Sequence, residues 1–369
     1  LMNKKTSYIL IVFFILIIFS LGIVTIFKTP TKISISERRE LKSIPIFNIS
    51  DVKTGKYFDN FESFLLDQIP LRDIFRRIKS INLFYIYHQK DNHKVFIKDG
   101  YAAQITYPLA KNKEDLLAKK INYLKEKYFK NSNIYSTIIP DKAYYLVKDN
   151  SYPLINYDNL RKNALKNLPN YIDIFDYLSI ESYYKTDTHW KNDEIIPVAK
   201  KLLHSMSMND DIVILSKKEL SPFYGVLYGQ SALPLKYDTI SYIDTNKNQN
   251  VSVFRANQKT KELEKGKLYY DEFINNNDPY DIFLGGASNI TVIDNTEVSN
   301  GKILYLFSDS FGRSLAPLLV SDYDKIIFID LRYIKMSSYV SEYGIMDNSD
   351  VLFAYSIQAL SVISNLQVD

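Results

Sequence analysis

Two short motifs far apart in the chain contain the residue types that a serine acyl-transfer site needs. The first, Asp-Thr-His-Trp at residues 187–190, contains an acid and a base, and the second, Ser-Asp-Ser-Phe-Gly at residues 308–312, contains a nucleophile. A serine hydroxyl is a poor nucleophile at neutral pH, so it needs a histidine to take its proton and a carboxylate to fix the tautomer of that histidine. Ser310, His189 and Asp187 are the candidates for these roles.

Each motif alone also has a plainer explanation. Ser308, Asp309 or Ser310 could cap a helix, because short oxygen-bearing side chains accept hydrogen bonds from its free amide groups. A histidine beside a tryptophan is more often structural than catalytic, and the chain contains three competing histidines, which are His88, His93 and His204. The joint occurrence of the two motifs is what favours a catalytic interpretation.

The segments around the motifs predict an α/β fold. The apolar run at 301–307 indicates a buried strand that places Ser310 where a strand turns into a helix, a common position for a nucleophile. Asp187 and His189 would project from the same side of an extended segment. Strands are expected at 94–101, 134–140, 171–175, 325–330 and 350–355, with a helix at 113–128. This alternation predicts a parallel sheet flanked by helices.

A β-rich insertion is expected over 212–243 and 250–273, next to the cleft, where Tyr224 could pack against a sugar ring. An apolar strand at 281–284 leads to two glycines. Gly286 and Asn289 are therefore candidates for donors to an oxyanion, although an ordinary glycine turn explains the same pattern. Lys142, just past a predicted strand, could bind an anionic group or be a surface lysine. Arg332 could orient a substrate or pair with a carboxylate.

Residues 8–27 are apolar and uncharged, and their length matches the roughly 20 residues of a membrane-spanning helix. No convincing cleavage site follows, so we expect an uncleaved signal anchor after a short head at residues 1–7. Residues 28–93 form a juxtamembrane segment that is mostly helical from 51 to 89, with a break near Pro70. The catalytic domain is expected to comprise residues 94–369. The lysines and arginines on the two sides of the span do not decide its orientation.

Composition indicates a globular body, with 46% hydrophobic and 24% charged residues. A net charge of +4 is too balanced to argue for nucleic acid as a partner. The absence of cysteine excludes disulfides, a thiol nucleophile and a cysteine-based zinc site. No metal-ligand cluster and no phosphate-binding glycine loop is found, so no metal and no cofactor is expected.

The chain resembles the SGNH-hydrolase-like O-acetyltransferases of the alginate acetylation type, the AlgX/AlgJ or DHHW proteins. Besides the two motifs, the similar segments are 37–41, 61–73, 139–142, 223–225, 281–286 and 330–333. The resemblance implies Ser310 as nucleophile, His189 as base and Asp187 as the orienting acid. The sequence departs from the family pattern in having Ser308 in place of glycine and Thr188 in place of histidine.

The resemblance further implies an extracytoplasmic enzyme, so the body is expected outside the membrane. Such an enzyme would move an acetyl group through an acyl-serine onto a secreted or cell-envelope polysaccharide. Its acetyl donor would be supplied by a membrane-bound O-acyltransferase. Two alternatives remain open from the sequence. One is a carbohydrate acetyl esterase, because water can replace the sugar hydroxyl, and the other is a noncatalytic glycan-binding or assembly protein.

Overall fold

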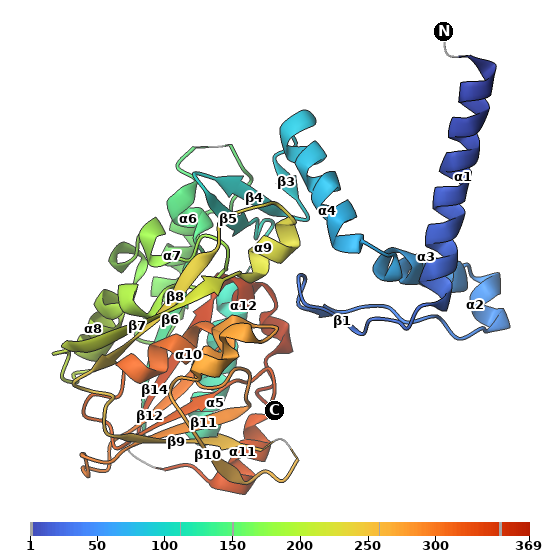
Figure 1. Cartoon of the computed structure of the whole chain (residues 1–369). Helices are drawn as coiled ribbons and strands as arrows, with labels where there is room; N and C mark the ends of the chain where they lie inside the picture. Colours follow the sequence, from blue (N-terminus) through green and yellow to red (C-terminus); the bar gives the residue numbers. More distant parts are fainter. Residues whose placement is uncertain (1–2, 111, 150, 258, 347–348) are drawn as a thin grey trace. The chain divides into compact units, whose positions relative to one another are not determined.

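The computed structural model describes residues 3–110, 112–149, 151–257, 259–346 and 349–369 (Figure 1). The chain forms two compact units. The first comprises the chain up to Asn92 together with Tyr228–Pro234, and the second comprises His93–Leu227 and Leu235–Asp369. Both predicted motifs lie in the second unit, so this unit contains the candidate site.

The second unit is built on a seven-stranded sheet in the order β10-β9-β11-β13-β12-β14-β6. The four parallel strands are β6 (Asn133–Ile139), β14 (Asp350–Ser356), β12 (Ile303–Ser308) and β13 (Lys325–Ile329). The sheet is extended by antiparallel pairing through β11 (Ile290–Asn295), β9 (Val251–Ala256) and β10 (Leu263–Gly266). Four of the predicted strands are thereby confirmed, and they form the parallel core of the sheet. They are the segments 134–140, 301–307, 325–330 and 350–355.

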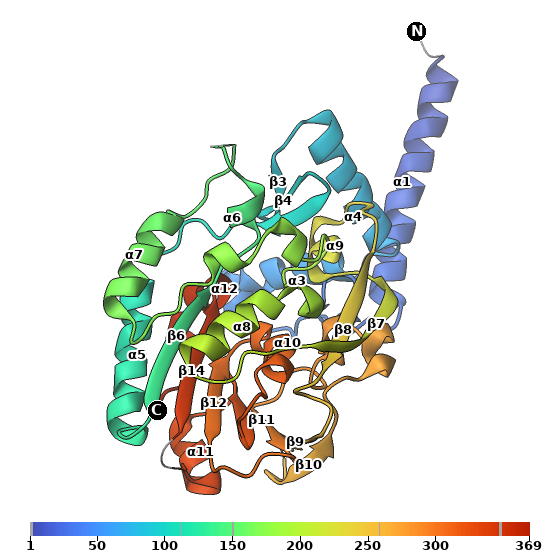
Figure 2. The ribbon, with the colours of Figure 1, turned by 90° about the vertical axis from the view of Figure 1, so that its left-hand side faces the viewer.

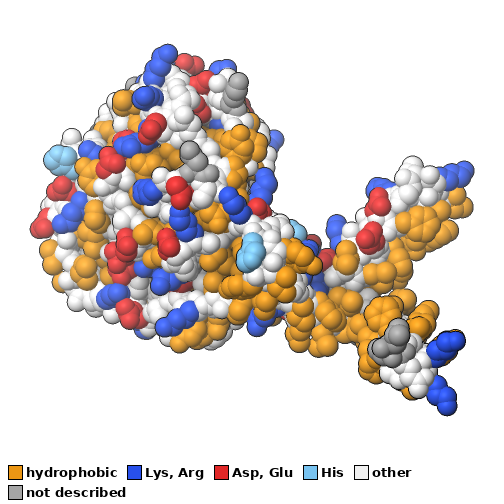
Figure 3. Space-filling view, turned by 90° about the horizontal axis from the view of Figure 1, so that it is seen from above, with side chains coloured by type: hydrophobic (Ala, Val, Ile, Leu, Met, Phe, Trp, Pro, Cys, Tyr) orange, Lys and Arg blue, Asp and Glu red, His pale blue; other side chains and the backbone are white. Residues whose placement is uncertain are grey.

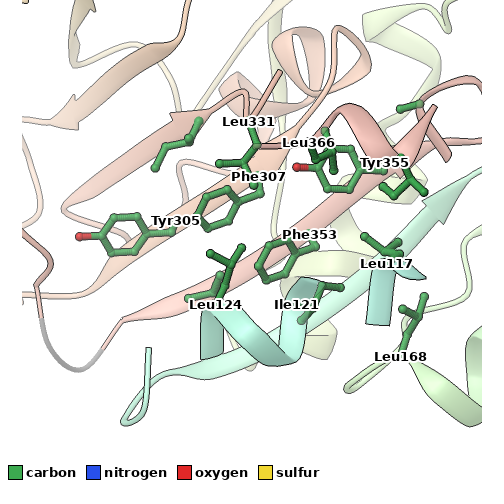
Figure 4. Packing of buried hydrophobic residues seen from close by; sticks show 14 of the residues in the cluster. Leu117, Ile121, Leu124, Leu168, Tyr305, Phe307, Leu331, Phe353, Tyr355 and Leu366 are labelled. Carbon is green, nitrogen blue, oxygen red and sulfur yellow. The ribbon is translucent and has the colours of Figure 1, made fainter. Parts of the chain in front are cut away.

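The central strand β12 is buried on both sides, which explains its uninterrupted apolar sequence. Leu304 and Leu306 face one layer of the core, and Tyr305 and Phe307 face the other, because successive side chains of a strand point to opposite faces. Figure 4 shows Tyr305 and Phe307 with side chains of the neighbouring helix and strand. Two hydrophobic layers therefore fix the position of β12, whose last residue, Ser308, is the first residue of the Ser-Asp-Ser-Phe-Gly motif.

Helices cover both faces of the parallel strands (Figure 2). The layer on one side includes α5 (Lys113–Tyr128), α7 (Tyr157–Asn167) and α12 (Ile357–Ser361). The layer on the other side includes α8 (Ile196–Ser205) and α10 (Phe311–Leu315), the helix that follows β12. The structure thus has the predicted α/β class, a parallel sheet flanked by helices.

The remaining elements of the second unit surround this core. They are the hairpin of β4 (Val95–Lys98) and β5 (Tyr101–Gln104), the ribbon of β7 (Ile214–Phe223) and β8 (Asp238–Thr245), the helices α6 (Ala143–Leu146) and α11 (Met336–Tyr343), and the 3-10 turns η2 (Phe175–Tyr177), η3 (Ile180–Ser182), η4 (Asn192–Glu194), η5 (Asp271–Asn275), η6 (Pro279–Ile282), η7 (Ala316–Leu318) and η8 (Ile363–Asn365). The dividing line between the two units falls within α9 (Val226–Ser231). The strand expected at 94–101 corresponds to β4 and the first residue of β5, because the chain turns at Asp99 and Gly100.

Two predicted strands are wrong. Residues 281–284 do not form a strand, because Pro279 and the side chain of Asp278, which accepts from the Tyr280 N–H, begin the 3-10 turn η6 instead. At 171–175 only Tyr171 makes an isolated bridge, to Ser136. The expected β-rich section divides in two: β7 and β8 form a separate ribbon, whereas β9 and β10 extend the main sheet.

The first unit contains α1 (Lys4–Phe27), β1 (Ile33–Ser34), β2 (Arg39–Glu40), α2 (Ile49–Lys53), α3 (Lys56–Gln68), α4 (Arg72–Ile81), the π-helical turn η1 (Asn82–Ile86) and β3 (Asp91–Asn92). In the described part of the chain, α1 is the one helix long and apolar enough to cross a membrane. Figure 3 shows hydrophobic side chains covering much of this unit. The predicted helical segment with a break near Pro70 is confirmed.

Polar contacts connect the segment after α1 to the end of α3. The Gln68 amide bonds to both Thr31 backbone groups, and the Asp67 carboxylate accepts two hydrogen bonds from Arg39, at 2.6 and 2.9 Å. The Lys42 N–H donates to the same carboxylate at 2.9 Å. These contacts give the polar segment, which was expected to be irregular, a defined path.

Candidate active site

Ser310 lies just beyond the carboxyl end of β12, at the edge where ligands bind in open α/β sheets. The Asp309 carboxylate accepts from the Phe311 N–H at 2.9 Å and from the Ser356 N–H at 3.0 Å. Ser308 donates through Oγ to the carbonyl of Ala354 at 2.5 Å. The residues flanking Ser310 therefore bind the ends of β12 and β14 together and fix the position of its hydroxyl.

Asp187 and His189 approach each other through a turn and not along the extended segment that the sequence predicted. Asp187 Oδ1 accepts from the backbone N–H of His189 at 3.1 Å and lies 2.5 Å from His189 Nδ1. Its second oxygen accepts from the Val226 N–H at 2.8 Å. A short carboxylate side chain that bonds the backbone two residues on is a usual turn arrangement. The turn directs the carboxylate to Nδ1.

The other imidazole nitrogen, Nε2, lies 2.7 Å from Ser310 Oγ. Asp187, His189 and Ser310 thus form one continuous line of contacts, and the first two side chains are buried. With Asp187 accepting from Nδ1–H, Nε2 is left as the acceptor for the serine proton. The arrangement can therefore remove that proton and hold the resulting imidazolium beside a carboxylate.

The tryptophan of the first motif connects it to the helix after the nucleophile. Trp190 is fully buried, and its Nε1–H donates to Ser314 Oγ at 2.9 Å and to the carbonyl of Phe311 at 3.2 Å. Asn192 Nδ2 donates to the carbonyl of Ser314 at 2.8 Å. Trp190 and Asn192 therefore hold the histidine segment against α10, so the distance between His189 and Ser310 depends on these two side chains.

Tyr280 forms one wall of the site. Its ring stacks on the imidazole of His189, and its hydroxyl bonds to Ser314 Oγ at 2.8 Å. Burial raises the pKa of Tyr280, so the side chain stays a neutral phenol. The guanidinium of Arg313 lies 5.6 Å from the same ring and pairs with Asp281 at 2.6 Å. Tyr280 therefore restricts the rotation of the His189 imidazole.

Lys142 is buried behind the acid, with 3% of its surface exposed. Its Nζ donates to the carbonyls of Asp187 at 2.6 Å, Tyr184 at 2.8 Å and Lys185 at 3.3 Å. Burial lowers the pKa of the Lys142 ammonium to about 7, an effect that Asp187 and Asp238 oppose. This position differs from both expectations, a substrate contact and a surface lysine.

A polar cavity of about 250 Å³ opens at the nucleophile. It is lined by Asp278, Asp281, Ala287, Ser288, Ser310, Arg313, Phe328, Asp330, Arg332 and Tyr333. Arg332 Nε donates to both oxygens of Asp330, at 2.9 and 3.1 Å, and Tyr333 is about half exposed. The cavity has room for a small acyl group and part of a polar acceptor next to Ser310 Oγ.

The structure places the other candidate residues as follows. Arg332 lines the cavity and also pairs with the carboxylate of Asp330. The predicted pairing with a carboxylate is therefore present, and its side chain also lies where a substrate could bind. The Gly286 N–H donates to the carbonyl of Phe283 at 3.2 Å, and Asn289 Oδ1 accepts from the Ile290 N–H at 2.9 Å. The cavity is lined by the residues between them, Ala287 and Ser288. Tyr224 stacks edge-on against Tyr237.

Sequence reasoning missed Tyr280, Arg313 and the interior position of Lys142. Tyr280 follows Asp278-Pro279, a helix-start signal that could have removed the strand prediction there. Nothing in the sequence around Lys142 indicates that its side chain is buried against a loop more than 40 residues later in the chain. Its role depends on a tertiary contact.

The described chain has a mixed α/β fold in which a serine, a histidine and an aspartate are in contact at the carboxyl edge of the parallel strands. Among solved structures, the chain is similar to a DHHW family protein from Eubacterium siraeum. The identity is 19% and the TM-score 0.57, over 74% of this chain and 96% of that chain. It is also similar to PatB1 of Bacillus cereus, solved with a sulfonyl adduct, at 18% identity and a TM-score of 0.57, over 72% of this chain and 97% of that chain.

These similarities confirm the predicted resemblance at the level of the fold. No family model matches the sequence. No curated protein matches it either. The assignment of chemistry therefore depends on the geometry of the site itself.

Proposed function

We propose that this protein is a serine-dependent O-acetyltransferase that transfers an acetyl group to a hydroxyl of a polysaccharide. The observation that carries the proposal is the continuous line of contacts from Asp187 through His189 to Ser310, ending at a polar cavity. The similarity in fold to a DHHW family protein and to PatB1 supports it.

In the first half-reaction, Ser310 Oγ attacks the carbonyl carbon of an acetyl donor while His189 Nε2 takes the hydroxyl proton. Asp187 accepts from Nδ1–H and stabilises the imidazolium that forms. The tetrahedral intermediate collapses when the bond to the leaving group breaks, and His189 returns the proton to that group. The product is an acetyl ester on Ser310.

In the second half-reaction, a sugar hydroxyl gives its proton to His189 and attacks the acetyl-serine. The bond to Ser310 Oγ then breaks, and the proton returns to that oxygen. Both intermediates carry an oxyanion that needs fixed donors. The candidates are the backbone N–H of Ser310 and those of Ala287 and Ser288, which line the cavity between Gly286 and Asn289.

We further propose that α1 is a membrane anchor and that the catalytic body lies outside the membrane, where a membrane-bound acyltransferase would supply acetyl groups. The length and apolar character of α1 support the anchor. The resemblance to extracytoplasmic O-acetyltransferases is what favours this orientation.

Intact-mass spectrometry after incubation with an activated acetyl ester tests the proposal, with Ser310→Ala and His189→Ala as the matched variants. We expect one acetyl adduct on the wild-type chain, mapped to Ser310, and none on either variant. A sulfonyl fluoride gives a second probe, because it would modify Ser310 irreversibly. If folded wild-type protein gives neither adduct, the triad assignment fails.

The fate of the adduct separates transfer from hydrolysis. An oligosaccharide acceptor should shorten the lifetime of the acetyl-serine and appear as an acetylated product. Release of free acetate alone, at a rate that no acceptor changes, would identify an esterase instead.

A further inference from the structure

Lys142 is a buried lysine whose ammonium bonds directly to the backbone of the acid–base loop, residues 184–189. It follows β6 at the same edge of the sheet as the nucleophile and begins α6. Its Nζ donates to carbonyls on both sides of Thr186, that is, to Tyr184 and Lys185 before it and to Asp187 after it. One ammonium group thereby closes this segment into a fixed loop.

The Lys142 ammonium is buried and bonds to backbone carbonyls. The three acceptors are carbonyl oxygens, which carry partial negative charges, so they solvate an ammonium without neutralising it. The charged groups that face it are the Asp187 carboxylate, on the loop itself, and Asp238, at the start of β8. Asp238 also accepts from the N–H groups of Lys185 and Thr186, at 2.9 and 2.7 Å, and so holds the same loop from its other side.

We propose that Lys142 is a positioning residue for acyl transfer, whose charged ammonium holds the carbonyls of the acid–base loop and thereby keeps His189 in line with Ser310. The inference rests on the function proposed above. Loss of the ammonium proton removes one of three donors and the charge that strengthens the others. The loop is then free to relax, and His189 moves away from the nucleophile.

The positioning depends on the charge of the Lys142 ammonium, so the acylation rate should fall as this group loses its proton near pH 7. This fall is the alkaline limb of the pH–rate profile. It should disappear when Lys142 is replaced.

Stability and activity should change in opposite directions with pH. The pKa of Lys142 is lower in the folded chain than in the unfolded chain, so the unfolded state binds more protons between about pH 7 and 10.5. Stability therefore rises with pH across this window, while the proposed positioning is lost. Alkaline inactivation of a chain that becomes no less stable would separate positioning from unfolding.

The test compares wild type, Lys142→Met and Lys142→Ala in the full-length protein, with Lys185→Met as the control, since Lys185 is an exposed lysine of the same loop. The readouts are the acylation rate with an activated acetyl ester across pH 5–9 and the thermal midpoint by circular dichroism. For Lys142→Met we expect kcat about 10- to 100-fold lower, with KM nearly unchanged and the alkaline limb absent. Lys185→Met should match the wild type.

Chemical rescue gives the second measurement. Lys142→Ala leaves space where the side chain was, and a small alkylammonium such as ethylammonium should restore part of the rate, more below its own pKa than above it. An unchanged pH profile in both Lys142 variants would overturn the inference. A Lys142→Met rate that falls only in proportion to the folded fraction would also overturn it. Failure of wild type itself to form the Ser310 adduct would instead be a failure of the proposed function.

Discussion

The imidazole of His189 lies flat against the ring of Tyr280, with the ring centroids 3.8 Å apart and the planes inclined by 8°. Asp187 and Ser310 fix the edge of the imidazole at its two nitrogens, and Tyr280 fixes its face. In the proposed mechanism His189 alternates between Ser310 and an acceptor hydroxyl, and it needs this restriction because rotation about its side-chain bonds would break both contacts.

Replacing Tyr280 by leucine should lower kcat through loss of this stacking, whereas phenylalanine should keep most of the rate. An aromatic pair contributes about 0.5–1.5 kcal/mol beyond its buried area, so we expect Tyr280→Leu to be roughly 3- to 10-fold slower than Tyr280→Phe. Tyr280→Phe isolates the hydroxyl contact to Ser314. Steady-state acetyl-ester turnover is the measurement, and equal rates for the two variants would contradict a role for the ring.

Ser308 and Gly312 should be energetically coupled. A Cβ at position 312 would lie 2.4 Å from both Cβ and Oγ of Ser308, so the serine fits only because residue 312 has no side chain. Gly312→Ala should cost about 1–3 kcal/mol by overpacking, despite the better helix propensity of alanine. In a Ser308→Gly background part of that cost should vanish, with a coupling of about 1 kcal/mol.

Chemical denaturation of the two single variants and the double variant measures this coupling. Strictly additive costs would show that the nearby Phe328 ring, 2.8 Å from the same Cβ position, sets the limit instead.

Gly225→Ala should inactivate the enzyme without unfolding it. A Cβ there would lie 2.3 Å from the carbonyl oxygen of Thr186 and 2.4 Å from Cβ of Asp187, so the acid must shift. A displaced acid affects both the tautomer and the direction of His189, and loss of the triad acid in a serine protease lowers kcat by about 10⁴-fold. We expect a fall of about 10²-fold or more, measured by acetyl-ester turnover, with the circular dichroism spectrum retained.

Asp67 should make the first unit sensitive to acid. The Arg39 guanidinium holds the pKa of the Asp67 carboxyl below its usual range, which means that this carboxylate stabilises the folded unit above about pH 4. The stabilisation is lost as pH falls through the lower, folded-state pKa. Hydrogen exchange at the Lys42 amide, which donates to Asp67, should therefore accelerate below about pH 4. In Asp67→Asn it should be fast at neutral pH as well.

Much of the core fold was predictable because β12, β13 and β14 are buried on both faces and consequently read as apolar runs. The contact of Asp187, His189 and Ser310 was predictable because these residue types occur together in motifs that resemble those of the DHHW proteins. The strand predicted at 281–284 failed because apolar residues there fill a small cluster around Tyr280 and Phe283 without pairing in a sheet. Burial alone does not distinguish a short 3-10 turn from a strand.

The supporting residues were not predictable for a different reason. Lys142 and Tyr280 are both far from His189 in the sequence. The Lys142 ammonium bonds to carbonyls of the loop that contains His189, and the Tyr280 ring stacks on the imidazole itself. Such contacts depend on tertiary packing, so no local period or spacing reports them. Trp190 is next to His189 in the sequence, but its bond to Ser314 depends on the position of α10.

The two halves of the triad are held by different kinds of structure. Ser310 follows a strand in the middle of the sheet, whereas Asp187 and His189 lie on an irregular loop fastened by side chains and a few amide groups. Melting of that loop requires no loss of the sheet. A heated sample should therefore pass through a state that is still folded by circular dichroism but already inactive, and it should regain full activity on cooling.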